Sequence, residues 1–203
     1  MAWRSHGTTN ATLVESLRRN GLITTSRVAT AMSSIDRAHF APSEPYQDRP
    51  QSIGHAATIS APHMHANAAE SLLPYLQPGA RVLDVGSGSG YLTCVLAALV
   101  MPGGTVVGVE HIEALREMGE RNSRKSELGR EWLSEGRVKF VKGDGRLGWK
   151  EGAPWDAIVS PISLRCSGGG YLVRPRLTWQ QHVGAAAAGF QQELVEQLKA
   201  PGR

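Results

Sequence analysis

The spacing of apolar residues changes along the chain. Residues 11–20, 26–35 and 65–76 place apolar side chains three and four positions apart, which predicts three amphipathic helices. Between the second and the third, residues 40–62 are rich in proline and glycine, and this composition prevents long regular elements. Because a long irregular segment inside a compact domain is usually functional, we expect this one to contribute to a site.

After residue 80, short apolar runs alternate with helical patterns. The runs predict buried strands at residues 81–85, 105–109, 137–141 and 155–158. Helical spacing over residues 91–101 and 112–125 separates the first three of them. This alternation predicts right-handed crossovers and a doubly wound parallel sheet of the α/β class. In such sheets ligands bind at the carboxyl ends of the strands.

Length, charge and cysteine content narrow the class of protein. With 203 residues, of which 41% are hydrophobic, we expect one domain around one core. The apolar stretch 92–101 is too short for the ~20 residues that cross a bilayer, and we find no targeting segment at the start. Cys94 and Cys166 have no disulfide or metal-ligand spacing, so we expect a cytoplasmic chain. Three of the four net positive charges lie in residues 159–181, so the charge gives no reason to expect a nucleic-acid partner.

A glycine-rich loop follows the first predicted strand, with the sequence Asp84-Val85-Gly86-Ser87-Gly88-Ser89-Gly90. Its three glycines allow a sharp turn and let a ligand approach the main chain closely, although a plain tight turn has the same composition. A dinucleotide-binding fingerprint needs G-x-G-x-x-G, and neither register of this loop supplies the third glycine. An NAD-dependent oxidoreductase is therefore disfavoured. Asp84 is placed to meet the ammonium group of an amino-acid-like cofactor.

Two more acids follow the next two predicted strands. Glu110 ends the second, where a carboxylate can accept both hydroxyls of a ribose, and Asp144 follows the third, where it would face the exocyclic amine of adenine. Either residue alone could be a surface acid. Together with Asp84 they predict a rim that binds a nucleoside carrying an amino-acid group, which describes S-adenosylmethionine.

Several longer motifs carry a family resemblance. Residues 51–54 read Gln-Ser-Ile-Gly, residues 57–65 read Ala-Thr-Ile-Ser-Ala-Pro-His-Met-His, and residues 143–146 read Gly-Asp-Gly-Arg. With the glycine loop, they closely resemble the protein-L-isoaspartate O-methyltransferases, above all the eukaryotic members. The resemblance implies a Rossmann-like fold and S-adenosylmethionine as the methyl donor. It also implies methylation of the free carboxylate of L-isoaspartyl and D-aspartyl residues in damaged proteins, which starts their repair.

The resemblance also implies roles for individual residues. Ser60 matches the serine treated as catalytic. The positions that match cofactor contacts, or that the loop pattern predicts, are Ala57, Thr58, Ile59, Ser60, His65, Asp84, Gly86, Gly88, Ser89, Glu110, His111, Gly143 and Asp144. Most members have Asp where Glu110 stands. His63 and His65 lack a third ligand, so we expect no metal. The expected partners are isoaspartyl proteins and peptides, without nucleic acid or membrane, and the expected state is a monomer.

The chain departs from the family pattern in two places. Residues 159–181 interrupt the resemblance, which resumes at residue 182, and two interpretations stay open: a retained in-frame intron, since Val159-Ser160 and Gln181 fit splice-site codons, or a tolerated surface insertion. Residues 198–203 resemble the turn before a fifth strand, so we expect a truncated sheet whose fourth strand has an unpaired edge. The alternative function is a non-catalytic truncated or mis-spliced form with at most residual cofactor binding. The expected organisation is one methyltransferase domain with N-terminal helices and the substrate and cofactor segment in 1–77, a Rossmann-like core in 78–158, a non-family insertion in 159–181 and the last helix in 182–203.

Overall fold

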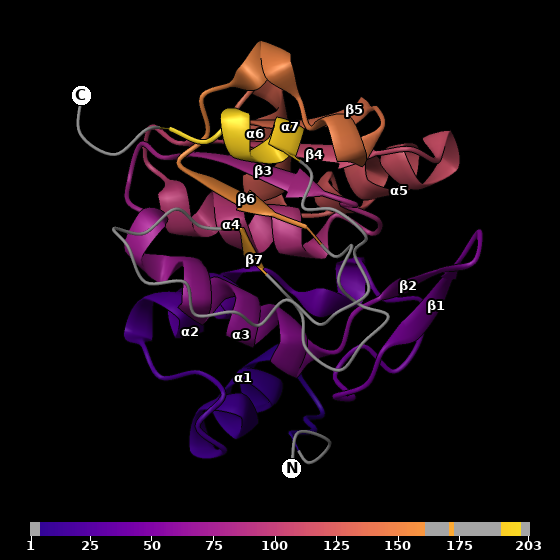
Figure 1. Ribbon diagram of the computed structural model, residues 1–203. Coiled ribbons are helices and arrows are strands. Elements are labelled where there is room, and N and C mark those ends of the chain that lie inside the picture. Colours follow the sequence, from indigo (N-terminus) through magenta and orange to yellow (C-terminus); the bar gives the residue numbers. More distant parts are fainter. Residues whose placement is uncertain (1–4, 161–170, 173–191, 200–203) are drawn as a thin grey trace.

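The computed structural model describes residues 5–160, 171–172 and 192–199, and its centre is a five-stranded sheet (Figure 1). The order of the strands is β5-β4-β3-β6-β7. The strands are β3 (Arg81–Val85), β4 (Thr105–Glu110), β5 (Val138–Lys142), β6 (Ala157–Val159) and β7 (Tyr171–Leu172). The first four are mutually parallel, which confirms the predicted α/β class, and β7 runs antiparallel to β6.

Helices cover both faces of this sheet. The α-helices are α1 (Asn10–Arg19), α2 (Ser26–Ser34), α3 (Pro62–Leu72), α4 (Tyr91–Val100), α5 (Glu113–Ser123), α6 (Glu127–Ser134) and α7 (Gln192–Glu196). The 3₁₀ helices are η2 (Arg37–His39), η3 (Leu73–Tyr75), η4 (Gly145–Leu147) and η5 (Lys150–Gly152). Figure 1 shows α1 to α3 on the side of the sheet that α4 covers, and α7 on the other side.

Alternation along the strands sorts the core into two layers. In β3, Val82 packs in the cluster that contains the helices α1 to α4, whereas Leu83 and Val85 pack in a second cluster with Trp155 and Leu194 of α7. Successive side chains of a strand point to opposite faces, so both faces of a central strand must be apolar. This requirement explains the continuous apolar runs of the sequence.

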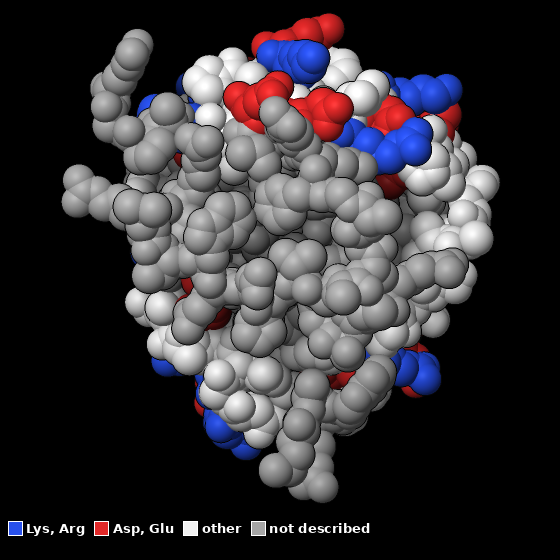
Figure 2. Space-filling view, in the orientation of Figure 1, with Lys and Arg blue, Asp and Glu red and all other residues white. Residues whose placement is uncertain are grey.

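The helix α5 carries much of the charge on the described surface. Arg116 pairs with Glu113 at 2.6 Å and with Glu120 at 2.9 Å, and Arg124 pairs with Glu120 at 2.6 Å. Figure 2 shows Lys and Arg side chains next to Asp and Glu side chains at the margin of the visible face. Exposed pairs of this kind each contribute little to stability, and their charges offset one another along the helix.

The segment predicted to be irregular contains a β-hairpin, which the sequence analysis missed. It consists of β1 (Gln51–Gly54) and the antiparallel β2 (Ala57–Ile59). The turn between them places Gly54, His55 and Ala56 at φ values of 85°, 52° and 56°. Residues other than glycine rarely adopt this left-handed backbone conformation, so His55 and Ala56 give no sign of the turn in the sequence.

The outer edge of β6 is paired, so the expectation of an unpaired fourth strand is wrong. Ile158 and Val159 pair with the two residues of β7, and Leu198 forms a parallel bridge with Trp155. The segment 159–181 thus contributes a strand to the sheet, and Leu198 already lies in a strand pairing rather than in a turn. Residues 161–170 and 173–191 lie outside the described residues. Gln181, one of the residues on which the retained-intron interpretation rests, is among them. The short helix α6 was also not predicted.

Among the described residues, no helix is both long enough and apolar enough to cross a membrane.

The core between α4 and the sheet supplies a first test. Leu96 is 0% exposed, so Leu96→Ala should lower the free energy of unfolding by about 2–5 kcal/mol, through lost transfer energy and the cavity left behind. Leu128 of α6 is 37% exposed, and Leu128→Ala should cost less than about 1 kcal/mol. Urea unfolding at neutral pH measures both. Equal losses in the two variants would contradict the described packing.

Candidate active site

The glycine loop between β3 and α4 has the geometry that its sequence predicts. Gly86, Gly88 and Gly90 have φ values of 77°, 49° and 85°, a region in which glycine carries no steric cost. The Gly86 N–H donates to the Val109 carbonyl at 2.8 Å, which fixes the start of the loop on β4. At the end of the loop, a Cβ on Gly90 would lie 3.0 Å from main-chain atoms of Gly119 and from the ring of Phe140. The loop therefore lies in close contact with β4 and α5.

Glu110 holds this loop from the neighbouring strand. It is the last residue of β4 and 4% exposed, and its Oε2 accepts a hydrogen bond from the Gly88 N–H at 3.1 Å. Its Oε1 accepts from the N–H groups of His111 and Ile112 at 2.9 and 3.1 Å. A carboxylate offers about four acceptor positions, so Glu110 keeps capacity for a ligand hydroxyl. The His111 ring is mostly exposed and lies 3.0 Å from Oε1.

Asp84 lies beneath the same loop. It is 3% exposed, it precedes the last residue of β3, and its Oδ2 accepts a hydrogen bond from the Thr93 hydroxyl at 2.6 Å. Burial raises its pKa to about 6, the Thr93 hydrogen bond opposes that rise, and the charge of Glu110 adds to it. A cation at this position would favour the ionised carboxylate. The environment of Asp84 therefore suits the ammonium group predicted from the sequence.

Asp144 lies on the same rim but already has a partner. Gly143 donates its N–H to the Glu110 carbonyl at 3.0 Å, which places the residues after β5 beside the end of β4. Asp144 caps η4 by accepting from the Arg146 N–H at 3.0 Å, and its carboxylate also accepts from the Arg146 side chain at 2.6 to 3.1 Å. These contacts lower the pKa of Asp144 to about 2. This pairing was not predicted from the sequence.

Gln197, just after α7, supports the loop that follows Asp144. Its Oε1 accepts from the Trp149 N–H at 2.8 Å, and its Nε2 donates to the Leu147 carbonyl at 2.7 Å. The side chain is buried. Gln197 was also not predicted from the sequence, because a glutamine 48 positions away from its partner leaves no local pattern.

The hairpin and α3 bring residues 57–65, the Ser60 segment, to the glycine loop. A Cβ on Gly88 would lie 3.4 Å from the Ile53 Cδ1, so β1 contacts the loop. His65 is buried, and its ring centroid lies 5.0 Å from that of Tyr91, the residue after Gly90. Ala57, Thr58 and Ile59 form β2 and lead directly into Ser60. Thr58 is exposed, Ile59 is buried, and Ser60 is half-buried.

A buried arginine behind this segment was not singled out from the sequence. Arg37 is 0% exposed, its Nη2 donates to the Ser60 carbonyl at 2.7 Å, and its Nη1 lies 3.2 Å from His65 Nδ1. Its guanidinium also lies over the Tyr91 ring, 5.0 Å from the centroid. Burial lowers the pKa of Arg37 to about 10, against the effects of Tyr91 and Asp48. The group therefore stays charged at neutral pH.

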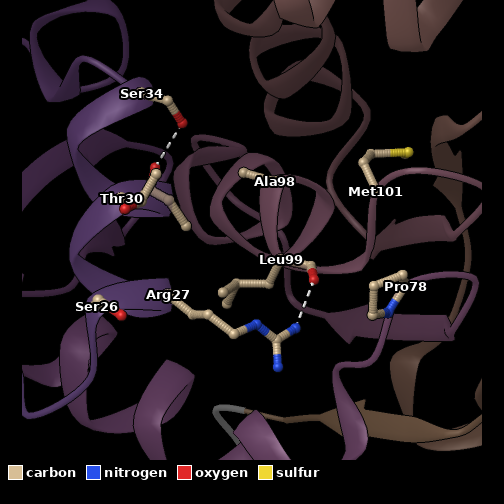
Figure 3. A pocket seen from close by; sticks show the side chains of 9 residues that line it. Ser26, Arg27, Thr30, Ser34, Pro78, Ala98, Leu99 and Met101 are labelled. Carbon is tan, nitrogen blue, oxygen red and sulfur yellow. Dashed lines mark hydrogen bonds between the residues drawn. The ribbon is translucent and has the colours of Figure 1, made fainter.

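The structure thus brings the predicted residues to one edge of the sheet. The residues Asp84, Gly86, Gly88, Ser89, Glu110, His111, Gly143 and Asp144 lie at or just beyond the carboxyl ends of β3, β4 and β5. The Ser60 segment reaches them through Ile53 and Tyr91. A pocket of about 280 Å³ between α2 and the end of α4 contains none of these residues (Figure 3).

Asp84 gives a prediction about pH. An acid with a folded pKa near 6 and an ordinary value of 3.8 keeps its proton longer in the folded state, so its ionisation removes stability as pH rises between those values. Asp84→Asn should therefore need more urea to unfold than the parent at pH 7, with a free energy of unfolding about 1–3 kcal/mol higher. This gain in stability should disappear near pH 4. Glu15→Gln, which removes an exposed charge from α1, is the control. A constant gain at all pH values would argue against a buried, ionised Asp84.

Comparison with known proteins identifies the family. The model of the protein-L-isoaspartate (D-aspartate) O-methyltransferases matches residues 8–165. A Caenorhabditis elegans protein-L-isoaspartate O-methyltransferase is 46% identical over 203 residues, covering 100% of this chain and 79% of that protein, and one from Triticum aestivum is 45% identical over 196 residues, covering 96% and 75%. A crystal structure of the Plasmodium falciparum counterpart in complex with S-adenosyl-L-homocysteine superposes with a TM-score of 0.76 at 29% identity and covers 97% of this chain and 82% of that one. The chain belongs to the protein-L-isoaspartate (D-aspartate) O-methyltransferase family.

Proposed function

We propose that this chain transfers a methyl group from S-adenosylmethionine to the free carboxylate of L-isoaspartyl and D-aspartyl residues in damaged proteins, and so starts their repair. The observation that carries the proposal is the convergence of two separate features. Buried acids on the strand ends lie at the glycine loop, and the hairpin that leads into Ser60 contacts the same loop through Ile53. Membership of the family supports the same reaction.

The residues at the strand ends fit the three parts of this cofactor. Asp84 would meet the ammonium group, since a cation relieves the cost of an ionised acid that is buried. Glu110 would accept the ribose hydroxyls, and the Gly143–Asp144 turn would lie against adenine. We propose that the remaining contacts come from the residues Ala57, Thr58, Ile59, Ser60, His65, Gly86, Gly88, Ser89 and His111.

The main task of this chain's residues is to align the substrate carboxylate with the methyl donor. When bound, S-adenosylmethionine supplies an electrophilic methyl group on a sulfonium sulfur. The substrate carboxylate, with a pKa of about 3.5, is already ionised at neutral pH, so its oxygen attacks the methyl carbon without a general base while the carbon–sulfur bond breaks. The Ser60 hydroxyl donates a hydrogen bond to that carboxylate and orients it. Alignment of this kind can supply several kcal/mol of the barrier.

We further propose a single monomeric domain that works in the cytoplasm without nucleic-acid or membrane partners. Residues 1–77 would form the substrate and cofactor part and residues 78–158 the Rossmann-like part. The continuous hydrophobic cluster that joins α1 to α4 with the sheet supports this organisation.

Methyl transfer can be tested directly on the purified full chain. With labelled S-adenosylmethionine and an isoaspartyl peptide, we expect label that is lost in base, as methyl esters are, and none with the matching aspartyl peptide. Ser60→Ala should lower kcat roughly ten- to a hundredfold because the carboxylate loses its orienting donor. Ser33→Ala, at an exposed position of α2, is the matched control.

Two outcomes would overturn the proposal. Label that survives base points to a different acceptor atom. Cofactor binding by the folded chain without any transfer points to the non-catalytic form considered from the sequence.

A further inference from the structure

We propose that Arg37 is a positioning residue of this site, which fixes the backbone at Ser60 and holds His65 as a neutral imidazole with its proton on Nε2. The expected effect of Arg37 on catalysis rests on the proposed function. The arrangement of the three side chains can be tested separately.

The first support for this role is the position of Arg37. It follows Asp36, whose side chain caps η2, and its own side chain is fully buried. One guanidinium reaches three elements: the Ser60 carbonyl after β2, His65 in α3, and the ring of Tyr91 at the start of α4. A planar group with five donors can satisfy such contacts in fixed directions. The Ser60 carbonyl is therefore held relative to the glycine loop.

Chemistry then fixes the proton of His65. A guanidinium has donors only, so the 3.2 Å contact between Arg37 Nη1 and His65 Nδ1 requires Nδ1 to accept. The ring must then be neutral and carry its proton on Nε2, which becomes a donor. Burial lowers the pKa of His65 well below its ordinary value, and the charges of Arg37 and His63 lower it further. A donor at Nε2 suits an anionic group such as a carboxylate.

The groups around His65 favour this state. Arg37 faces it from η2, Tyr91 lies against its ring from α4, and His63 shares α3. Asp48 is fully buried, and its Oδ1 accepts from the His63 N–H at 3.0 Å and lies 2.7 Å from His63 Nδ1. Its charge raises the pKa of Arg37, which keeps the guanidinium protonated.

Arg27 offers a matched control. It also binds main-chain carbonyls with one guanidinium nitrogen, which donates to Leu76 and, at 3.0 Å, to Leu99. Figure 3 shows the contact with Leu99. Leu76 directly follows η3, and Leu99 lies near the end of α4 and lines the pocket that contains no predicted site residue. An arginine lost here removes similar hydrogen bonds without touching Ser60 or His65.

The experiment combines nitrogen NMR with kinetics. Full chain labelled with ¹⁵N-histidine should show His65 with an unprotonated Nδ1 and a protonated Nε2 at pH 7, and His65→Asn identifies the signal. In Arg37→Lys and Arg37→Met we expect this single state to be lost. In Arg37→Lys we also expect kcat on the isoaspartyl peptide to fall roughly ten- to a hundredfold, because misplacement of the carboxylate costs alignment. Arg27→Lys should change neither readout.

Each outcome decides the proposal. A proton on Nδ1 of His65 in the parent chain, a doubly protonated ring at pH 7, or an unchanged His65 signal in the folded Arg37→Lys variant overturns it. Equal loss of kcat in Arg27→Lys and Arg37→Lys reduces Arg37 to a purely structural role. Because the NMR measurement needs no substrate, a chain that does not methylate contradicts the proposed function while the His65 signal still decides the role of Arg37. If both Arg37 variants fail to fold, the parent signal alone decides.

Discussion

The carboxylate of Glu110 is the group on which the arrangement of this edge depends. It is buried at the end of β4, and the N–H groups of Gly88, His111 and Ile112 donate to it. A buried carboxylate without such donors would cost several kcal/mol, so its presence requires the glycine loop to lie where it does. The hydrogen bond from the Gly88 N–H joins the loop after β3 to the last residue of β4. A single side chain thereby sets the distance between the loop after β3 and the turn after β4.

This constraint also explains the charge state of the site. Asp84 lies under the same loop, and the charge of Glu110 adds to the burial that raises its pKa. The protein without ligand therefore holds an acid whose ionisation at neutral pH lowers the stability of the fold. A ligand with an ammonium group removes that cost, whereas a neutral nucleoside does not. The site thus favours a cationic amino-acid group through an energy already present in the folded chain.

Some of this could be predicted from the sequence, and the reasons are physical. The strand β3 has the predicted bounds because a central parallel strand is apolar on both faces, and the loop was predicted because its φ values require glycine. The hairpin was missed because His55 and Ala56 adopt positive φ without a sequence signal. Arg37 was missed because its acceptor is the main chain of Ser60, 23 positions away, and any residue has a carbonyl.

The part that could not be predicted is also the part that holds the main chain at Ser60. Asn10, at the start of α1, donates its side-chain amide to the Met32 carbonyl at 3.0 Å, and its Oδ1 accepts from the Arg37 N–H at 3.4 Å. The first two helices therefore fix the main chain of Arg37, and Arg37 in turn fixes Ser60. A reaction that needs no general base gains its rate from such alignment, so the rigidity of these helices bears on the chemistry. Lysine could not replace the arginine, because a single ammonium lacks the planar fork that donates to Ser60 and His65 at once.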